Sequence, residues 1–298
     1  MVTFKIGDET IGPVDATIID LALQREALAR TAITTRVLSL PPFALGDNFS
    51  GNEAVEFCHT VNRQLGDVAV GSRGKFLAYA TVPLRDPRRS ADVLREAVEE
   101  HALRGVEICT YAGSLELDDE SLEPFWAAVE SLDLPVLLHP HKVAGAERMG
   151  PYYMRNVVGN PCETALAASR IVFGGVLARH PRMKLILSHG GGAFPFIIGR
   201  LQHGAEVRPE CRCAIEPREA LGRLYVDTVV FDPRILRALL SLMPPDHVVL
   251  GSDSPFSMSE DSPVEIVESA VPVESDRSTI LSGTASMLLK DGSGDAGA

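Results

Sequence analysis

Residues 184–196, KLILSHGGGAFPF, join a short apolar strand to a histidine, His189, followed by three glycines and an apolar segment. Two other apolar runs end in a comparable way: PVLLH ends at His139, and HVVLGSD ends at Asp253. In a parallel α/β barrel the C-terminal ends of the strands converge at one mouth, where catalysis takes place. The three side chains are therefore predicted to share one site.

Short β-branched runs alternate with longer amphipathic stretches along most of the chain. This alternation is typical of repeated βα units with a parallel sheet, and near-continuous apolar runs fit strands buried on both faces. The expected strands cover residues 33–40, 75–82, 105–110, 135–139, 184–189, 223–228 and 247–253. A closed (β/α)8 barrel needs eight strands, so the pattern predicts a barrel that lacks one.

The first 15 residues do not supply the eighth strand. Breaks at Gly7-Asp8 and Gly12-Pro13 make this segment a small hairpin and not a buried core strand. We therefore expect the first barrel strand to be missing. A truncated N-terminus explains this better than a true loss, since an open seam would expose unpaired backbone edges.

Composition sets outer limits on domain number, partners and location. The 298 residues suit one α/β barrel or two small domains, and we expect a single barrel domain over 1–290 with a disordered tail at 291–298. A net charge of -12 argues against a nucleic-acid partner. No apolar run approaches the roughly 20 residues of a membrane helix. The acidic N-terminus and five scattered cysteines predict a cytoplasmic protein with reduced thiols.

Three helix N-termini are predicted, each by a capping side chain directly before a proline. These capping residues are Asp86, Asn160 and Asp232. Glu163, three residues after Asn160, makes that start resemble a capping box and predicts a helix over 161–180.

Imidazole and carboxylate groups together at strand ends suit a divalent metal such as zinc. Such a metal would lower the pKa of a bound water and polarise a substrate oxygen. Taken alone, His139 is more often a structural hydrogen-bonding residue, and Asp253 could cap a helix within its Ser-Asp-Ser turn. For each of these two residues, the sequence alone is compatible with a metal ligand and with a structural role.

His189 also has two interpretations. The glycines after it bring backbone close to whatever the imidazole faces, and a helix N-terminus that favours anions follows. These features favour a general acid/base, whereas the alternative is a glycine-rich turn beside a core histidine. His141, two residues after His139, is expected to line the pocket first and to act as a ligand second, because Pro140 interrupts the strand geometry.

Three stretches give the chain a family resemblance: HPHKVAGAERMG, GNPCETALAASRIVFGGVLARHPRMKLILSHGGGAFPFIIGRLQHG and VVLGSDSPF. They resemble the amidohydrolase-related (amidohydrolase 2) family, and within it the aminocarboxymuconate-semialdehyde decarboxylases most closely. The γ-resorcylate decarboxylases are more distant. The resemblance runs from about Leu28 to about Leu289.

The resemblance implies a distorted TIM barrel that holds a single divalent metal, usually zinc. His139 and Asp253 match the family's metal ligands on strands five and eight, and His189 matches its acid/base histidine. Arg200 matches an arginine that binds carboxylate in a neighbouring subunit's site, which implies a homodimer with shared active sites.

Departures from the family pattern concern both metal and substrate. The family's His-x-His on strand one has no counterpart, so metal affinity is expected to fall below that of a complete site. Asn156 and His141 stand where pocket tryptophans are found, and the N-terminal substrate arginine is matched only loosely by Lys5. With Phe256 these residues are expected to contact the substrate, and the lost aromatic wall argues for a different substrate.

The leading hypothesis is a metal-dependent non-oxidative decarboxylase of a conjugated or aromatic carboxylic acid. The first alternative is hydrolysis of a lactone, amide or ester on the same scaffold, because fold does not fix function. The second alternative is a catalytically incomplete barrel that binds a ligand without metal.

Overall fold

A parallel sheet forms the centre of the computed structural model, which describes residues 1–6, 9–46 and 49–289. Five parallel strands pair in the order β11-β10-β9-β8-β5. Their bounds are Val106–Cys109 (β5), Pro135–His139 (β8), Lys184–Leu187 (β9), Tyr225–Asp227 (β10) and Val248–Val249 (β11). Two more strands, β3 (Arg36–Leu38) and β4 (Phe76–Ala78), also pair in parallel, and a bridge from Ala80 to Val106 joins them to β5.

All seven strands expected from the sequence are confirmed, and together they form one arc. Within the described residues, the end strands β3 and β11 do not pair with each other. The α/β architecture of a distorted (β/α)8 barrel is confirmed. The strands are mostly apolar because they are buried on both faces, as in other sheets covered by helices.

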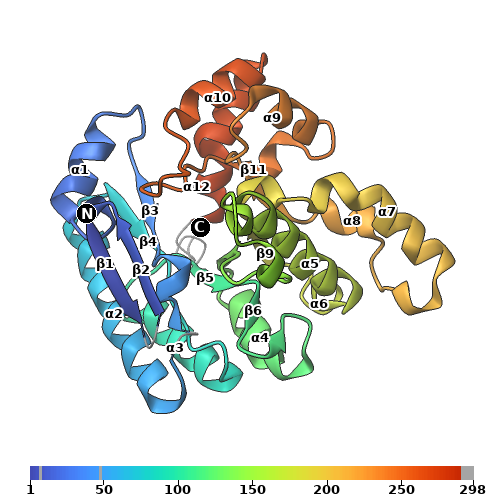
Figure 1. The fold of residues 1–298 in the computed structure, drawn as a ribbon, viewed down its shortest axis with the longest axis horizontal. Coiled ribbons are helices and arrows are strands. Elements are labelled where there is room, and N and C mark those ends of the chain that lie inside the picture. The colour runs from blue at the N-terminus through green and yellow to red at the C-terminus, as the bar shows by residue number, and fades with distance from the viewer. Residues whose placement is uncertain (7–8, 47–48, 290–298) are drawn as a thin grey trace, which may run out of the picture.

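Helices surround the arc of strands (Figure 1). They are Leu21–Ala29 (α1), Gly51–Gly71 (α2), Pro87–Glu99 (α3), Glu123–Ser131 (α4), Asn160–Phe173 (α5), Val176–Arg179 (α6), Phe194–Val207 (α7), Pro217–Leu221 (α8), Pro233–Leu240 (α9), Pro263–Ala270 (α10), Glu274–Ser278 (α11) and Thr284–Leu288 (α12). Large side chains such as Phe76, Phe125, Trp126 and Phe194 are fully buried between helices and strands. This core fixes the strand ends that carry the polar residues.

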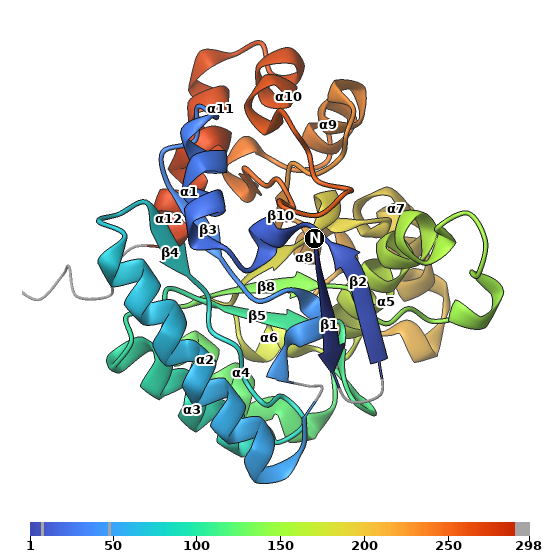
Figure 2. The same cartoon turned by 60° about the vertical axis from the view of Figure 1, so that its left-hand side comes forward.

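The N-terminal hairpin is confirmed and lies next to the mouth of the barrel. Strands β1 (Val2–Ile6) and β2 (Glu9–Val14) pair antiparallel. Phe4 packs on Phe43 with ring centroids 5.3 Å apart, and Phe43 in turn packs on His141. Figure 2 shows the hairpin in front of β5 and β8. The Gly7-Asp8 break lies outside the described residues.

Two of the three predicted helix starts are confirmed. The Asp86 and Asp232 side chains accept hydrogen bonds from the backbone of the first turns of α3 and α9. The Asn160 cap is wrong because a π-helical turn, Arg155–Gly159, runs directly into α5 and makes Asn160 helical. The predicted helix 161–180 is two helices, α5 and α6, separated where Gly175 has a φ of 75°.

Two further sequence predictions concern the C-terminal tail and membrane-spanning helices. The tail predicted for 291–298 lies outside the described residues. Within the described residues, no helix combines the length and apolar character needed to cross a membrane.

Candidate active site

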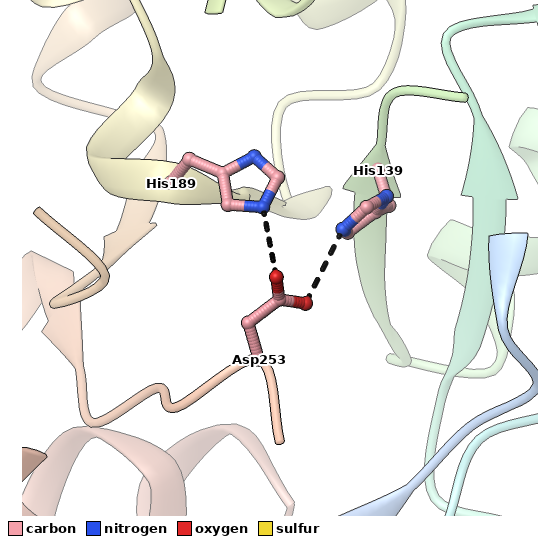
Figure 3. Close-up of side chains that lie close together, drawn as sticks. All are labelled: His139, His189 and Asp253. Atoms are coloured by element: carbon pink, nitrogen blue, oxygen red, sulfur yellow. Dashed lines mark ion pairs between the residues drawn. The ribbon is translucent and has the colours of Figure 1, made fainter. Parts of the chain in front are cut away.

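Three side chains from three strand ends meet at the mouth of the arc (Figure 3). His139 is the last residue of β8, His189 follows β9 by two residues, and Asp253 follows β11. One oxygen of Asp253 lies 3.7 Å from His139 Nε2, and its other oxygen lies 3.7 Å from His189 Nε2. The imidazoles stand edge to face, with centroids 4.7 Å apart. The structure thus brings the three predicted residues together.

The His139 imidazole is held in one orientation. Its Nδ1 lies 2.8 Å from the carbonyl oxygen of Pro140, which can accept only if Nδ1 carries the proton. In the neutral imidazole Nε2 then carries the lone pair, and this atom is buried and has no hydrogen-bond partner among the described residues. Burial lowers the pKa of His139, but Asp253 and Glu107 outweigh burial and raise it overall. A buried nitrogen lone pair aimed at a carboxylate is the arrangement expected of a metal ligand.

Asp253 carries the negative charge of the site. Burial alone would raise its pKa, but the two facing imidazoles outweigh burial and lower the pKa to about 2. The carboxylate is therefore ionised at neutral pH. Its φ of 56° is unusual for a residue with a side chain, and such strained backbone is concentrated at functional sites.

The turn at His189 depends on positive φ angles and on hydrogen bonds from its backbone to one carboxylate. His189 also has a positive φ, 57°. Asp227, the last residue of β10, accepts hydrogen bonds from the backbone N–H of His189 at 3.0 Å and of Gly190 at 2.8 Å. Gly192 has a φ of 58°, and a Cβ there would lie 2.5 Å from the carbonyl oxygen of Pro161. The glycine-rich turn therefore presents His189 to Asp253, and not to an apolar core.

The three donors fit a divalent cation. Two imidazole nitrogens and one carboxylate oxygen lie within 4.8 Å of one another, and nitrogen and oxygen donors together suit zinc or manganese. A second group of potential ligands, Glu96, Glu100 and His101, lies on and just beyond α3. Glu100 is exposed, whereas Glu96 and His101 are half-buried.

Glu107 is not among the predicted site residues, although the structure places it beside the site. Glu107 lies on β5 and pairs in register with Leu137 of β8, two residues before His139. Because side chains alternate between the two faces of a strand, Glu107 lies on the same face of the sheet as His139. Burial raises the pKa of its carboxyl to about 7, and Asp253 adds to the rise while His139 opposes it. A single acidic residue inside the apolar run GVEICT was the available signal.

Aromatic rings line one side of the mouth. The Phe43 ring lies 6.4 Å from His141 and 6.4 Å from Phe256, measured between centroids. Both predicted pocket residues therefore lie in one cluster close to His139 and Asp253. Next to this cluster is a cavity of about 70 Å³ lined by Pro42, Arg85, Cys109, Tyr111, Gly113, His141 and Lys142.

The remaining predicted site residues take no part in the ion pairs and the ring contact that join the three central side chains. Asn156 is half-buried in the π-helical turn before α5. Lys5 is exposed on β1 and adjoins Phe4, so in an extended strand it points to the opposite face. Arg200 is exposed on α7. The substrate roles predicted for these residues stay predictions.

Residues 22–290 match the amidohydrolase family. The chain belongs to this family. It is 34% identical to the 2-amino-3-carboxymuconate-6-semialdehyde decarboxylase of Dictyostelium discoideum over 277 residues, which are 91% of this chain and 77% of that protein. It is 28% identical to the gamma-resorcylate decarboxylase of Rhizobium radiobacter over 206 residues, 65% of this chain and 61% of the relative. The resemblance expected from the sequence is confirmed.

A solved structure supports the fold assignment. The dihydroxybenzoic acid decarboxylase from Polaromonas, with bound manganese and the inhibitor 2-nitroresorcinol, superimposes with a TM-score of 0.80 at 24% identity. The match covers 89% of this amidohydrolase chain and 84% of the other. A divalent metal is therefore present in a relative of the same architecture.

Proposed function

We propose that this amidohydrolase is a metal-dependent non-oxidative decarboxylase of an aromatic or conjugated carboxylic acid. The observation that carries the proposal is the ionised Asp253 carboxylate, which lies 3.7 Å from two imidazole Nε2 atoms at the mouth of the barrel. The names of the relatives support it, because both curated relatives described above are decarboxylases.

His139 and Asp253 would hold the metal, and we assign zinc as the resident ion. The nitrogen and oxygen donors suit zinc, while the manganese in the Polaromonas enzyme makes manganese the alternative outcome of elemental analysis. When bound, the ion would act as a Lewis acid toward a substrate oxygen. Each remaining step belongs to side chains of the protein.

His189 is the proton donor in this mechanism. Its Nε2 faces the centre of the site, and its backbone is fixed through Asp227. Nε2 gives a proton to the ring or chain carbon that bears the carboxylate. The bond from that carbon to the carboxylate then breaks, CO2 leaves, and the electron pair of the bond restores the conjugated system. His189 regains its proton from solvent.

The substrate is proposed to lie against the aromatic cluster. His141 and Phe256 supply one wall, and their contacts with Phe43 support this placement. Asn156 and Lys5 are kept as proposed substrate contacts on the family resemblance alone.

A homodimer with shared active sites forms part of the proposal, with Arg200 reaching a partner's substrate carboxylate. Arg200 and Phe196 lie one helical turn apart on α7, and Phe196 is 50% exposed. Leu166 on the neighbouring helix α5 is 43% exposed. Exposed apolar side chains on two packed helices support an interface there.

We also retain a single barrel domain over 1–290 and a cytoplasmic location as proposals. The family match over residues 22–290 supports the first. Free thiols at Cys162, Cys211 and Cys213 support the second, because thiols stay reduced in the cytosol.

A substrate panel tests the proposed function. Full-length protein loaded with Zn²⁺ or Mn²⁺ is given aromatic carboxylic acids on one side and aryl lactones, amides and esters on the other. The expected result is release of CO2 from at least one acid. Hydrolysis of an ester, amide or lactone without CO2 release from any acid would overturn the assignment.

A further inference from the structure

Two histidines and two glutamates lie together on the outside of the barrel, at the C-terminal end of α3. Glu96 lies in the last turn of α3, Glu100 caps its end, and His101 follows. His59 comes from α2, which packs side by side with α3 (Figure 2). Potential ligand atoms of Glu96, Glu100 and His101 all lie within 4.8 Å of one another. These residues form a group separate from the three central side chains at the strand ends.

The two imidazoles converge on the carboxylate of Glu96. His59 Nδ1 lies 2.7 Å from Glu96 Oε1, and because a carboxylate only accepts, Nδ1 donates this hydrogen bond. His101 Nε2 lies 3.8 Å from the same oxygen, which is too far for a hydrogen bond. Two ligands of one tetrahedral zinc lie about 3.4 Å apart, since Zn–N and Zn–O bonds are about 2.1 Å long. The separation of Glu96 and His101 therefore suits a shared ion better than a direct contact.

The end of α3 concentrates negative charge where such charge destabilises a helix. Glu96, Glu99 and Glu100 lie in the last turn and at the C-cap, next to the negative end of the helix dipole. Residues 96–99, all within the described part of the chain, include no lysine or arginine. Glu96 and Glu100 are also four residues apart, a spacing at which like charges on a helix repel each other. A divalent cation between the two carboxylates would remove both sources of repulsion.

Close packing against α2 holds His101 in place. A Cβ at Gly66 of α2 would lie 2.5 Å from the carbonyl oxygen of His101 and 2.8 Å from its Cβ, so glycine allows this approach. The side chains of His101 and Glu96 are only 17% and 34% exposed. Side chains that are fixed before binding lose little conformational freedom when a ligand binds. His101 and Glu96 are therefore prepared for an ion, while the exposed Glu100 leaves the group open to solvent.

A groove of about 410 Å³ between α2 and α3 adjoins the group. His59 and Glu96 line its wall. The other charged residues among its described lining are the carboxylates Glu56 and Asp92 and the guanidinium Arg89. Because the carboxylates outnumber the guanidinium, the electrostatic potential in the groove favours the approach of a cation.

We propose that Glu96, Glu100 and His101 bind a zinc ion, and that His59 orients Glu96 through its hydrogen bond. Imidazole and carboxylate donors suit zinc, and one water molecule would complete a tetrahedral set of ligands. Mn²⁺ binds such donors more weakly than Zn²⁺ and is not expected to occupy this second site. The zinc ion fastens the end of α3 to α2 and so stabilises the fold. The inference does not depend on the proposed decarboxylation.

Zinc content of the full-length protein tests the site, measured by elemental analysis after equilibrium dialysis against micromolar Zn²⁺. Glu100→Gln and His101→Ala should each bind one zinc ion fewer per chain than the wild type. Glu99→Gln is the matched control, because it removes a neighbouring exposed carboxylate outside the ligand group, and it should bind as much zinc as the wild type. Equal zinc content in the wild type, Glu100→Gln and His101→Ala overturns the inference.

A variant with an impaired central site separates the two sites. Asp253→Asn lacks the charged ligand of the central site, so a rise in its Tm on addition of Zn²⁺ measures binding at the second site. The rise should be present in Asp253→Asn and absent from the double variant Asp253→Asn with Glu100→Gln. No rise in Asp253→Asn, or an equal rise in the double variant, would also overturn the inference. Neither measurement requires turnover of a substrate.

Discussion

The carboxylate of Asp227 accepts a hydrogen bond from the backbone N–H of His189 at 3.0 Å, and so the end of β10 positions the proton donor that follows β9. The same carboxylate also accepts from Gly190 and Val229. One residue that need not touch the substrate thus fixes the turn that presents the imidazole.

Asp227→Asn should therefore lower kcat more than it changes KM. An amide has one accepting oxygen, so it leaves at least one of the buried N–H groups without an acceptor, at a cost of about 1–3 kcal/mol in the free energy of unfolding. Urea denaturation and steady-state kinetics provide the measurement. The exposed Asp67→Asn variant is the control and should behave as the wild type. A kcat equal to that of the wild type would contradict the positioning role.

His189→Gln should abolish turnover and leave the metal bound. Removing a positioned proton donor typically costs about 10²–10⁴ in rate. Metal content per chain, determined by elemental analysis, should match that of the wild type. Substantial residual activity would show that His189 is not the proton donor, and metal loss would show that it is a required ligand.

Asp253→Asn should eliminate stabilisation of the protein by Mn²⁺. At a Mn²⁺ concentration a hundredfold above Kd, binding stabilises the folded state by about 2.7 kcal/mol, and Tm rises accordingly. The neutral amide should lose this rise. The control is Glu100→Gln, which changes an exposed carboxylate of the separate group on and just beyond α3 and should keep the rise. A Tm rise that depends on Glu100 and not on Asp253 would place the metal elsewhere.

Glu107 should make stability fall as pH rises. Its pKa is about 7 in the folded protein, mainly through burial, against an ordinary value of 4.5. Between these values the folded protein binds a proton that the unfolded chain does not, so the free energy of unfolding decreases as pH rises through this window. In the presence of EDTA, Glu107→Gln should remove a decrease of roughly 3 kcal/mol.

Urea titrations from pH 4 to pH 8 measure this difference. Glu147→Gln, a change at an exposed carboxylate, should retain the wild-type pH dependence. Parallel pH curves for wild type and Glu107→Gln would show that the buried carboxyl does not have the raised pKa.

The seven strands could be predicted from apolar runs that alternate with amphipathic stretches, and the three central residues because each ends such a run with a side chain able to bind a metal or transfer a proton. The Asn160 cap could not be judged correctly, because the cap exists only if the preceding residues are not helical, and the π-helical turn makes them so. Local sequence contains no direct signal for that turn.

The residues around the centre required the three-dimensional structure. Arg85 and Lys142 are 57 residues apart in the chain, and only the folded barrel brings both to one cavity. The role of Asp227 depends on which backbone N–H groups its carboxylate meets. A sequence pattern gives the residue type at a strand end but not its contact partners.

The most direct test of metal-dependent decarboxylation follows a substrate with a ¹³C-labelled carboxylate in D2O. The labelled acid is incubated with EDTA-treated protein before and after Mn²⁺ is restored, and products are read by NMR. We predict labelled CO2 and bicarbonate, and one deuteron on the carbon that lost its carboxylate, only after metal is restored and not with His189→Gln. Retention of the label in the organic product while the protein turns over would contradict it.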